Sequence, residues 1–266
     1  MDGTDRALQS PLSNSLATQV PGGSRVSPPS ASGARLPRLA RAPRGIRFAV
    51  QLSLLPLPWT VRRVLLNWGF GFDIHPTARI GFSIVDTRRL QMGPGSRIGH
   101  FNLFHSLEEC AFGDLAAIGK FNWIAGAHSD DRRVYPNSPQ RYSRFVVGRS
   151  AQIVDGHRID CADRVEIGPF SVLAGEGSAI FTHGIEIEEC EQTCAPVRIG
   201  AYALVNARCF FVKGTELADF CVVAAGAVCA FKNSEPYGLY AGVPARRIKD
   251  LSKDAAYFSR ARGPVD

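Results

Sequence analysis

The sequence predicts an all-β fold, a parallel β-helix built from hexapeptide repeats. Between residues 199 and 231, a large apolar residue stands at every sixth position, and a small residue follows each one four places later. A period of six matches neither an α-helix, at about 3.6, nor one face of a strand, at about 2. It fits a chain that makes a flat strand, turns and repeats, so that three sixes close one triangular coil. The large residues are Ile199, Val205, Phe211, Leu217 and Val223, and the small ones are Ala203, Cys209, Thr215, Cys221 and Ala227.

The same repeat is present over most of the chain. It begins at Ile74 and predicts one β-helical domain over residues 73–232, followed by a C-terminal extension over 233–266. Two stretches have no sixes, 128–145 and 184–198, and we expect them to be loops that leave the coils at corners. Long loops on a rigid scaffold are places where function is often found.

The first 72 residues differ from the repeat domain. Residues 1–45 are rich in Ser, Pro, Gly and Arg, which predicts a disordered tail, although a transit peptide or a membrane-surface arm also fits. Residues 46–72 are apolar and predict a partly helical cap across the open first coil, because solenoids need capped ends. The alternative for 46–70 is peripheral contact with a membrane. The predicted apolar face of its helix contains Val61, Val64, Leu65 and Trp68.

The excess of positive charge is confined to the N-terminal part of the chain. Residues 1–63 contain nine Arg and two acidic residues, whereas the rest of the chain has equal numbers of acidic and basic residues. The net charge of +7 therefore comes from the N-terminal segment, and the balanced repeat domain gives no indication of a nucleic-acid partner.

The cysteines and the hydropathy indicate the compartment. Seven Cys are present, and several occupy inward places of the repeat, where a free Cys behaves as a small hydrophobe. This usage favours a reducing compartment. No stretch has the roughly 20 apolar residues of a membrane span. We therefore expect a cytoplasmic protein, which could lie at the inner face of the membrane.

Three short motifs add chemistry to the repeat. Thr182-His183-Gly184 ends a regular six just before the second interruption, and a His at such a corner has a pKa suited to general-base catalysis. Small residues over 223–227 leave backbone groups open to a ligand along the coil. Residues 241–248 then bring two Arg close to that run. Each motif alone is equally compatible with ordinary packing or a local turn.

Together these motifs resemble the hexapeptide-repeat acyltransferases. The similarity covers about residues 74–250 and is to the branch with galactoside and maltose acetyltransferases and the acetyltransferases of capsule, colanic-acid and Nod-factor synthesis. It rests on the sixes, Thr182–Gly184, Pro196–Gly200, Ala225-Gly226 and Ala241–Ala245. The resemblance implies left-handed coils, a homotrimer, acetyl-CoA bound in the grooves between subunits, and no metal.

The resemblance also assigns roles to residues of this chain. His183 matches the general base, and we expect an acid of the following loop, Glu186, to orient its imidazole. The residues that match the acetyl-CoA site are Ala207, Ala225, Gly226, Lys232, Pro244 and Arg247, the last of which is suited to a phosphate by its charge and fork geometry.

The sequence also suggests residues that line the acceptor site. Polar residues that interrupt the apolar frame are candidates to line it, namely Asn122, His128, His157 and Asp160. The expected reaction is O-acetylation of a sugar or glycan hydroxyl, in the synthesis of a surface polysaccharide or glycolipid.

Two other functions are compatible with a β-helix. A γ-type carbonic anhydrase binds zinc through His, and His100 and His105 have the required spacing, with His75 or His128 as the third ligand. A catalytically inactive scaffold is the other alternative, although the presence of His183 argues against it.

Overall fold

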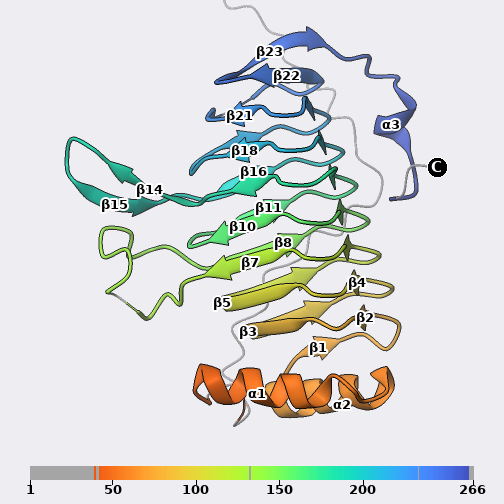
Figure 1. The fold of residues 1–266 in the computed structure, drawn as a ribbon. Helices are drawn as coiled ribbons and strands as arrows, with labels where there is room; N and C mark the ends of the chain where they lie inside the picture. The colour runs from red at the N-terminus through yellow and green to blue at the C-terminus, as the bar shows by residue number, and fades with distance from the viewer. Residues whose placement is uncertain (1–38, 40–41, 132, 233, 264–266) are drawn as a thin grey trace, which may run out of the picture.

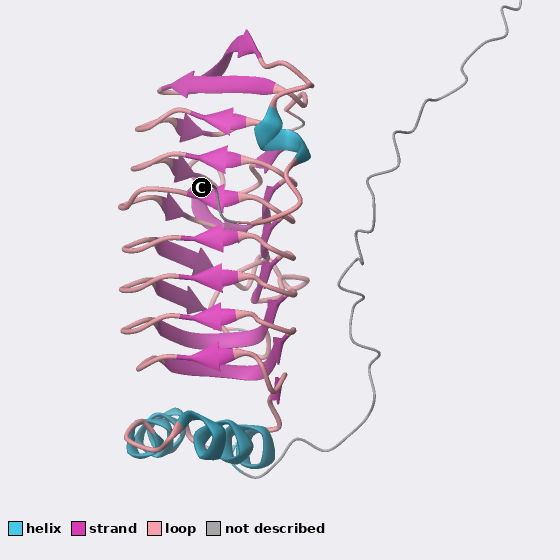
Figure 2. Cartoon of the chain, turned by 90° about the vertical axis from the view of Figure 1, so that its right-hand side faces the viewer, coloured by secondary structure: helices cyan, strands magenta, loops and turns pink. Residues whose placement is uncertain are grey.

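The chain forms a left-handed parallel β-helix that stands on two α-helices (Figure 1). The computed structural model describes residues 39, 42–131, 133–232 and 234–263. As the column rises from the helices, the strands on its near face in Figure 2 run from right to left, which makes the coils left-handed. The predicted fold class is therefore confirmed. Most of the predicted tail, 1–45, lies outside the described residues.

Three faces of parallel strands form the column, and we number them in the order used below. Face 1 contains the first halves of β3 (Ile84–Met92) and β5 (Leu103–Phe112), then β7 (Trp123–Gly126), β10 (Arg158–Cys161), β13 (Ala179–Ile180), β18 (Phe210–Phe211) and β21 (Val228–Cys229). Face 2 contains β1 (Asp73–Ile74), the second halves of β3 and β5, then β8 (Arg144–Val147), β11 (Val165–Ile167), β16 (Val197–Ile199) and β19 (Glu216–Leu217). Face 3 contains β2 (Arg79–Ile80), β4 (Arg97–Ile98), β6 (Ala117–Ile118), β9 (Gln152–Ile153), β12 (Val172–Leu173), β17 (Leu204–Val205), β20 (Val222–Val223) and β22 (Gly238–Gly242).

The core consists of the large residues of the sixes, stacked in register from coil to coil. Ile167, Ile199 and Leu217 are partners on successive strands of face 2, and each is almost fully buried. All five large and all five small residues named for 199–231 are buried as well. The predicted frame of this stretch is therefore confirmed.

The two ends of the column are closed differently. At the C-terminal end, β23 (Ala245–Asp250) pairs antiparallel with β22, and the short α3 (Ala256–Ser259) follows. At the N-terminal end, α1 (Arg44–Leu54) and α2 (Trp59–Phe70) lie across the first coil. In the described part of the chain, no helix combines the length and apolar character needed to cross a bilayer.

The cap helices turn polar side chains toward the coil. Arg47 donates to Thr87 O at 2.8 Å, and Arg62 donates to Gly81 O at 2.8 Å. Gln51 makes two 2.9 Å hydrogen bonds with the backbone of Val85. These groups satisfy backbone atoms at the open edge of the first coil, which would otherwise be buried without partners.

The apolar face that the sequence predicts for α2 is consequently on the outside. Val61, Val64 and Trp68 are exposed by 47%, 55% and 79%, whereas Arg62 and Leu66 face the coil. The expectation that the apolar stripe packs on the coil is therefore wrong in its orientation, although the helix and its capping position are present.

Both predicted loops leave the column at one corner, between face 1 and face 2, which we call the insertion corner. One connects β7 to β8, and the other contains the antiparallel hairpin β14 (His183–Glu186) and β15 (Glu191–Cys194). In Figure 1 the two extend from the same side of the column. Two segments that are far apart in sequence are thereby brought next to each other.

Candidate active site

A His–Asp pair stands at the insertion corner. His183 is the first residue of β14, and Asp160 belongs to β10, which pairs with β13, the strand that precedes β14. The Nδ1 atom of His183 lies 2.8 Å from Oδ2 of Asp160. Because a carboxylate can only accept, Nδ1 carries the proton in the neutral imidazole, which leaves Nε2 with a free lone pair.

Thr182 fixes the carboxylate of this pair. Its backbone N–H donates to Asp160 Oδ2 at 3.1 Å, and its buried hydroxyl lies 2.9 Å from the same oxygen. The hydroxyl oxygen also accepts from the backbone N–H of Asp163 at 3.0 Å. The Thr-His sequence thus supplies both the base and a group that holds its partner in place.

The pair perturbs the ionisation of both members. The hydrogen bond to Asp160 raises the pKa of His183, against the opposing effects of burial and of Lys213. Burial alone would raise the pKa of Asp160, but the hydrogen bonds from His183 and Thr182 outweigh it and lower that pKa. The arrangement stabilises an imidazolium beside a carboxylate, which is the state that a base reaches after accepting a proton.

Aromatic rings flank the imidazole of His183. The ring of Tyr135, from the loop between β7 and β8, lies 5.2 Å from it, and that of Phe181 lies 6.4 Å away, edge to face. The side chain of His183 is still 29% exposed. The imidazole therefore lies near two aromatic rings and is partly open to solvent.

The two insertions that form the site are tied together. Ser138 Oγ, in the first loop, accepts from the backbone N–H of Cys194 on β15 at 2.8 Å. The guanidinium of Arg141 is buried and donates to the carbonyl oxygens of Ala127 and His128 at 2.6 and 2.8 Å. It also lies 5.3 Å over the Tyr135 ring. Arg141 thus holds the loop that brings Tyr135 to His183.

Glu186 does not orient His183. Its carboxylate is bound by Lys213 Nζ and by Thr193 Oγ1, the latter at 2.9 Å. It lies three residues after His183, on a strand that leads away from the column. The partner of His183 is Asp160, so the prediction for Glu186 is corrected. The pKa of Glu186 is lowered chiefly by its hydrogen bond from Lys213.

Asn122 and His157 are structural residues of a different corner, between face 3 and face 1. Asn122 is 1% exposed, and its Oδ1 accepts from the backbone N–H of His157 at 2.8 Å. His157 is 2% exposed, and its Nδ1 accepts from the backbone N–H of Ser178 at 3.2 Å. Burial lowers the pKa of His157. Both side chains satisfy backbone groups inside the column, so the prediction that they line an acceptor pocket is wrong.

The other two acceptor candidates lie at the insertion corner. Asp160 is the partner of His183, a role different from the one expected. His128 begins the first loop, and its Nδ1 lies 3.5 Å from Oε1 of Glu108. Of the four candidates, the structure therefore brings only Asp160 into contact with His183.

Two lysine side chains lie at the insertion corner, on the coils above His183. A Cβ added to Gly184 would lie 3.3 Å from Cε of Lys213, and one added to Gly214 would lie 3.5 Å from Cε of Lys232. Lys232 is exposed. Two Lys thus follow His183 along the column, in the direction of the C-terminal coils; Lys213 is paired with Glu186, and Lys232 is exposed to an anionic ligand extending from His183.

The small residues predicted for the acetyl-CoA site lie across face 1 from His183. Ala207 and Gly226 stack at the corner between face 3 and face 1, where Gly226 N donates to Ala207 O at 3.0 Å. Ala225 and Gly226 are exposed, and a Cβ at Gly226 would meet nothing within 4 Å. Pro244 follows β22, which is in register with β20 and carries the chain past this corner.

Arg247 is already engaged within the chain. Its guanidinium donates to Asp250 Oδ1 at 2.9 Å and to the carbonyl oxygen of Glu235 at 3.1 Å. These partners lie at the C-terminal end of the column, beside the corner between faces 2 and 3. Arg247 therefore has partners within the chain, and its contact with a phosphate of CoA stays a prediction.

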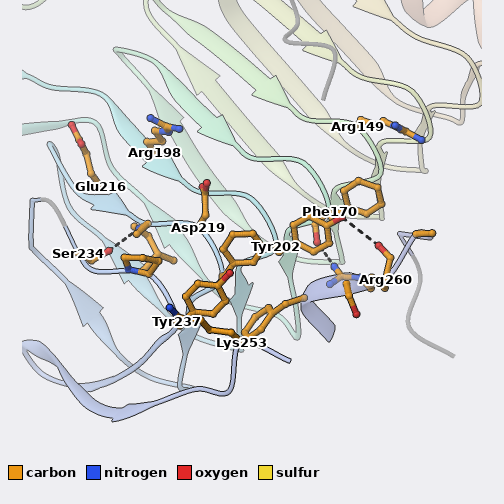
Figure 3. Close-up of a pocket in the computed structure, with 17 residues that line it drawn as sticks. Arg149, Phe170, Arg198, Tyr202, Glu216, Asp219, Ser234, Tyr237, Lys253 and Arg260 are labelled. Carbon is orange, nitrogen blue, oxygen red and sulfur yellow. Dashed lines mark hydrogen bonds between the residues drawn. The ribbon is translucent and has the colours of Figure 1, made fainter. Parts of the chain in front are cut away.

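A cavity of about 970 Å³ lies away from His183, at the corner between faces 2 and 3 (Figure 3). The rings of Phe170, Tyr202, Phe220 and Tyr237 stack along it, with successive centroids 4.8, 5.4 and 4.8 Å apart. Because these rings face one another and Phe258 packs edge-on against two of them, the stack serves mainly to anchor the C-terminal segment. The paired ionisable groups are at His183, and the candidate active site is therefore placed there.

The His residues considered as zinc ligands do not meet. His100 accepts from the backbone N–H of Phe82 at the corner between faces 3 and 1, and His105 lies on face 1 beside Trp123. Within the described ranges, no three His, Cys, Asp or Glu side chains gather as a metal site would require. Nothing in this part of the chain favours the carbonic anhydrase alternative.

Several residues of the site were not predicted from the sequence. Tyr135 and Arg141 lie in a loop without periodicity, which gives no indication of which side chain returns to the column. Thr182 was noted only as part of the motif. The pairing of Asp160 with His183 is a relation between adjacent coils, and one signal for it was present, because Asp160 interrupts the apolar frame.

Comparison with known proteins gives structural similarity only. No family model matches the sequence, and no curated protein does. Among solved structures, a polysialic acid O-acetyltransferase, OatWY, is 16% identical, with 71% of this chain and 90% of that chain covered and a TM-score of 0.45. A hexapeptide-repeat acetyltransferase from Vibrio cholerae O1 biovar eltor, VCA0836, solved with acetyl coenzyme A, is 18% identical, with 77% and 85% covered and a TM-score of 0.30.

A third similar structure is a maltose O-acetyltransferase from Clostridium difficile 630. It is 14% identical, with 61% of this chain and 70% of that chain covered and a TM-score of 0.30. At such identities and TM-scores the comparisons leave the activity of this chain to be argued from its own residues.

Proposed function

We propose that the protein is an acetyl-CoA-dependent O-acetyltransferase whose acceptor is a hydroxyl of a sugar or glycan. The observation that carries the proposal is the 2.8 Å His183–Asp160 pair, set at an open corner of a β-helix that has the acyltransferase motifs. A surface polysaccharide or glycolipid intermediate is the proposed acceptor class, and a homotrimer is the proposed assembly. These finer assignments rest on the sequence resemblance.

In the proposed reaction His183 acts as the general base. Its Nε2 takes the proton of the acceptor hydroxyl as that oxygen attacks the thioester carbon of acetyl-CoA. The tetrahedral intermediate then collapses, the carbon–sulfur bond breaks, and the imidazolium returns a proton to the CoA thiolate. Asp160 stabilises the imidazolium through its hydrogen bond and keeps Nε2 turned toward the substrate.

Small residues and cations of the upper coils are suited to the donor. Exposed Ala225 and Gly226 leave one edge of face 1 smooth, and Lys213 and Lys232 line the opposite edge above His183. A long pantetheine arm needs a smooth apolar path, and the phosphates at its end need positive charge. We propose that CoA extends from His183 toward the C-terminal coils along this face.

The acceptor is proposed to lie below His183 on face 1. His105, Ala125 and Asp160 are in register on neighbouring strands, and all three point outward because Phe104, Ile124 and Ile159 point into the core. Ala125 is small and leaves room between the two larger side chains. Trp123, with Arg158 stacked 5.0 Å over its ring, lies beside this space and offers the apolar surface that sugars favour.

The test is acetyl transfer by the purified full chain and by His183→Ala. We expect acetyl-CoA to shift the melting temperature of both proteins. In assays with a panel of sugars, we expect the wild type to transfer acetyl groups and His183→Ala to transfer them about 10²–10⁴-fold more slowly. Transfer that persists unchanged in His183→Ala would show that the mechanism is wrong. No response of the wild type to acetyl-CoA would remove the proposed donor.

A further inference from the structure

The outer surface of the cap helices is apolar, although it faces away from the column. α1 and α2, with the turn between them, expose seven large hydrophobic side chains, each by 36% or more. Trp68 is the most exposed of them, at 79%. The seven are Ile46, Phe48, Leu52, Leu57, Val61, Val64 and Trp68. We call this set the cap surface.

The orientation of the helices is fixed by polar contacts on their inner side. Arg47 forms a 2.7 Å ion pair with Asp86, and Arg62 and Gln51 bind backbone groups of the first coil. Arg47, Gln51 and Arg62 are each no more than 5% exposed. Turning the apolar side inward would leave these groups unpaired, so the cap surface faces outward as part of the fold.

The two cap helices lie at one end of the molecule. In Figures 1 and 2 the two helices run side by side at the same level, across the base of the column. Their axes are roughly perpendicular to the axis of the β-helix. A planar partner could therefore contact both helices at once.

The charge around the cap surface is positive. Residues 42–72 contain no acidic residue, and of their four Arg only Arg47 and Arg62 are buried against the coil. Arg44, at the start of α1, has a side chain that is 60% exposed. An amphipathic surface with Trp, Leu and Val on one side and Arg near it is the composition that binds the boundary of an anionic bilayer.

We propose that the cap surface docks on an anionic lipid membrane, with both helices in the plane of the headgroups and the β-helix standing away from it. A second copy of the chain is a poorer occupant, because a symmetric contact would bring two positive surfaces together. The acyl region takes up the seven apolar side chains, and the exposed Arg44 meets lipid phosphates.

The experiment is co-sedimentation of the full chain with phosphatidylcholine vesicles, with and without phosphatidylglycerol. We expect binding that requires the anionic lipid and weakens as salt is added. The test variant is Leu52→Ser/Val64→Ser/Trp68→Ser, whose substituted residues are all exposed, so that folding is preserved. The matched control is Ile187→Ser/Phe210→Ser/Ile248→Ser, which removes exposed hydrophobic side chains elsewhere.

The expected result is a vesicle affinity at least about tenfold lower for the cap variant and unchanged for the control. Equal binding by the wild type and the cap variant would overturn the proposal, as would an absence of binding by the wild type. If the cap variant instead lowered the sedimentation mass without vesicles, the occupant would be a second copy. If binding appeared only after removal of residues 1–38, that segment would be the occupant.

Discussion

The protonation of His183 depends on one hydrogen bond, from its Nδ1 to Asp160 at 2.8 Å. Because the pKa of His183 is raised, the neutral base is lost as the pH falls through that raised value, and kcat/KM should fall with it. In Asp160→Asn the carboxylate is gone, so the pKa of His183 returns toward its ordinary value. We expect the acidic limb of the pH profile to move to lower pH, while the plateau of kcat/KM falls by about 10²–10⁴-fold.

The matched control for this change is Glu186→Gln. Glu186 is an acid three residues beyond His183, but its carboxylate binds Lys213 and Thr193. The pH profile of this variant should have the same acidic limb as that of the wild type. A shift in Glu186→Gln, or no shift in Asp160→Asn, would contradict the assignment of Asp160.

At the level of residues, the sequence located the motif but not its partner. Thr182-His183-Gly184 is a local signal, and the structure places His183 at a corner as expected. The choice of Glu186 followed closeness in sequence, whereas β14 leads that side chain away and β10 brings Asp160 in from the coil below. Asn122 and His157 stood out because they are polar residues within an apolar pattern. Inside a column, however, polar side chains also satisfy buried backbone groups.

Among the structural elements, the loop between β7 and β8 depends on Arg141. In Arg141→Met its carbonyl partners, including those of Ala127 and His128, lose their donor, at a cost of about 1–3 kcal/mol in the free energy of unfolding. Tyr135 would then no longer be held against His183. We expect the KM for the acceptor to rise about tenfold, with the KM for acetyl-CoA and the acidic limb of the pH profile unchanged.

Arg133→Met is the control within the same loop. The Arg133 side chain is 91% exposed and pairs only with nearby Asp131 among the described residues. Steady-state kinetics of this variant should match those of the wild type. If both Arg variants raised the acceptor KM equally, the effect would come from charge and not from the fold of the loop.

The hexapeptide coils offer a stability test in two adjacent residues of β18. Phe211 is fully buried and stacks on Ile180 and Cys229, whereas Phe210 is 43% exposed. Phe211→Ala should lower the free energy of unfolding by about 3–5 kcal/mol, because it removes core contacts and leaves a cavity. Phe210→Ala should change it by about 0.5 kcal/mol or less. Urea unfolding of both variants checks this, and equal losses would contradict the repeat frame.

The cap shows where sequence patterns mislead at this level. An apolar stripe normally marks the buried side of a helix, and on that rule Val61, Val64 and Trp68 face inward. The first coil, however, presents unpaired backbone groups to the cap, and Arg47, Gln51 and Arg62 are needed there. The pattern identified the helix, and hydrogen bonding at the coil edge decided its orientation.

For the molecule as a whole, the period of six was enough to predict the column. Each six specifies only a strand and a corner, but stacking in register repeats that unit into three faces, so a local rule gives the overall shape. The two insertions follow no period. They meet at one corner because each of them interrupts the chain between face 1 and face 2. That is why the coils could be predicted from the sequence, whereas the residues that the insertions bring to His183 could not.

The proposed assembly is the remaining property of the whole molecule. We propose a trimer because the His183 side chain is 29% exposed in the single chain, and a neighbouring copy at this corner would exclude water from both reactants. We expect sedimentation to give three times the chain mass of 28.8 kDa. Specific activity should fall on dilution in step with dissociation of the trimer. Full activity in a fraction that sediments as a single chain would show that one copy completes the site alone.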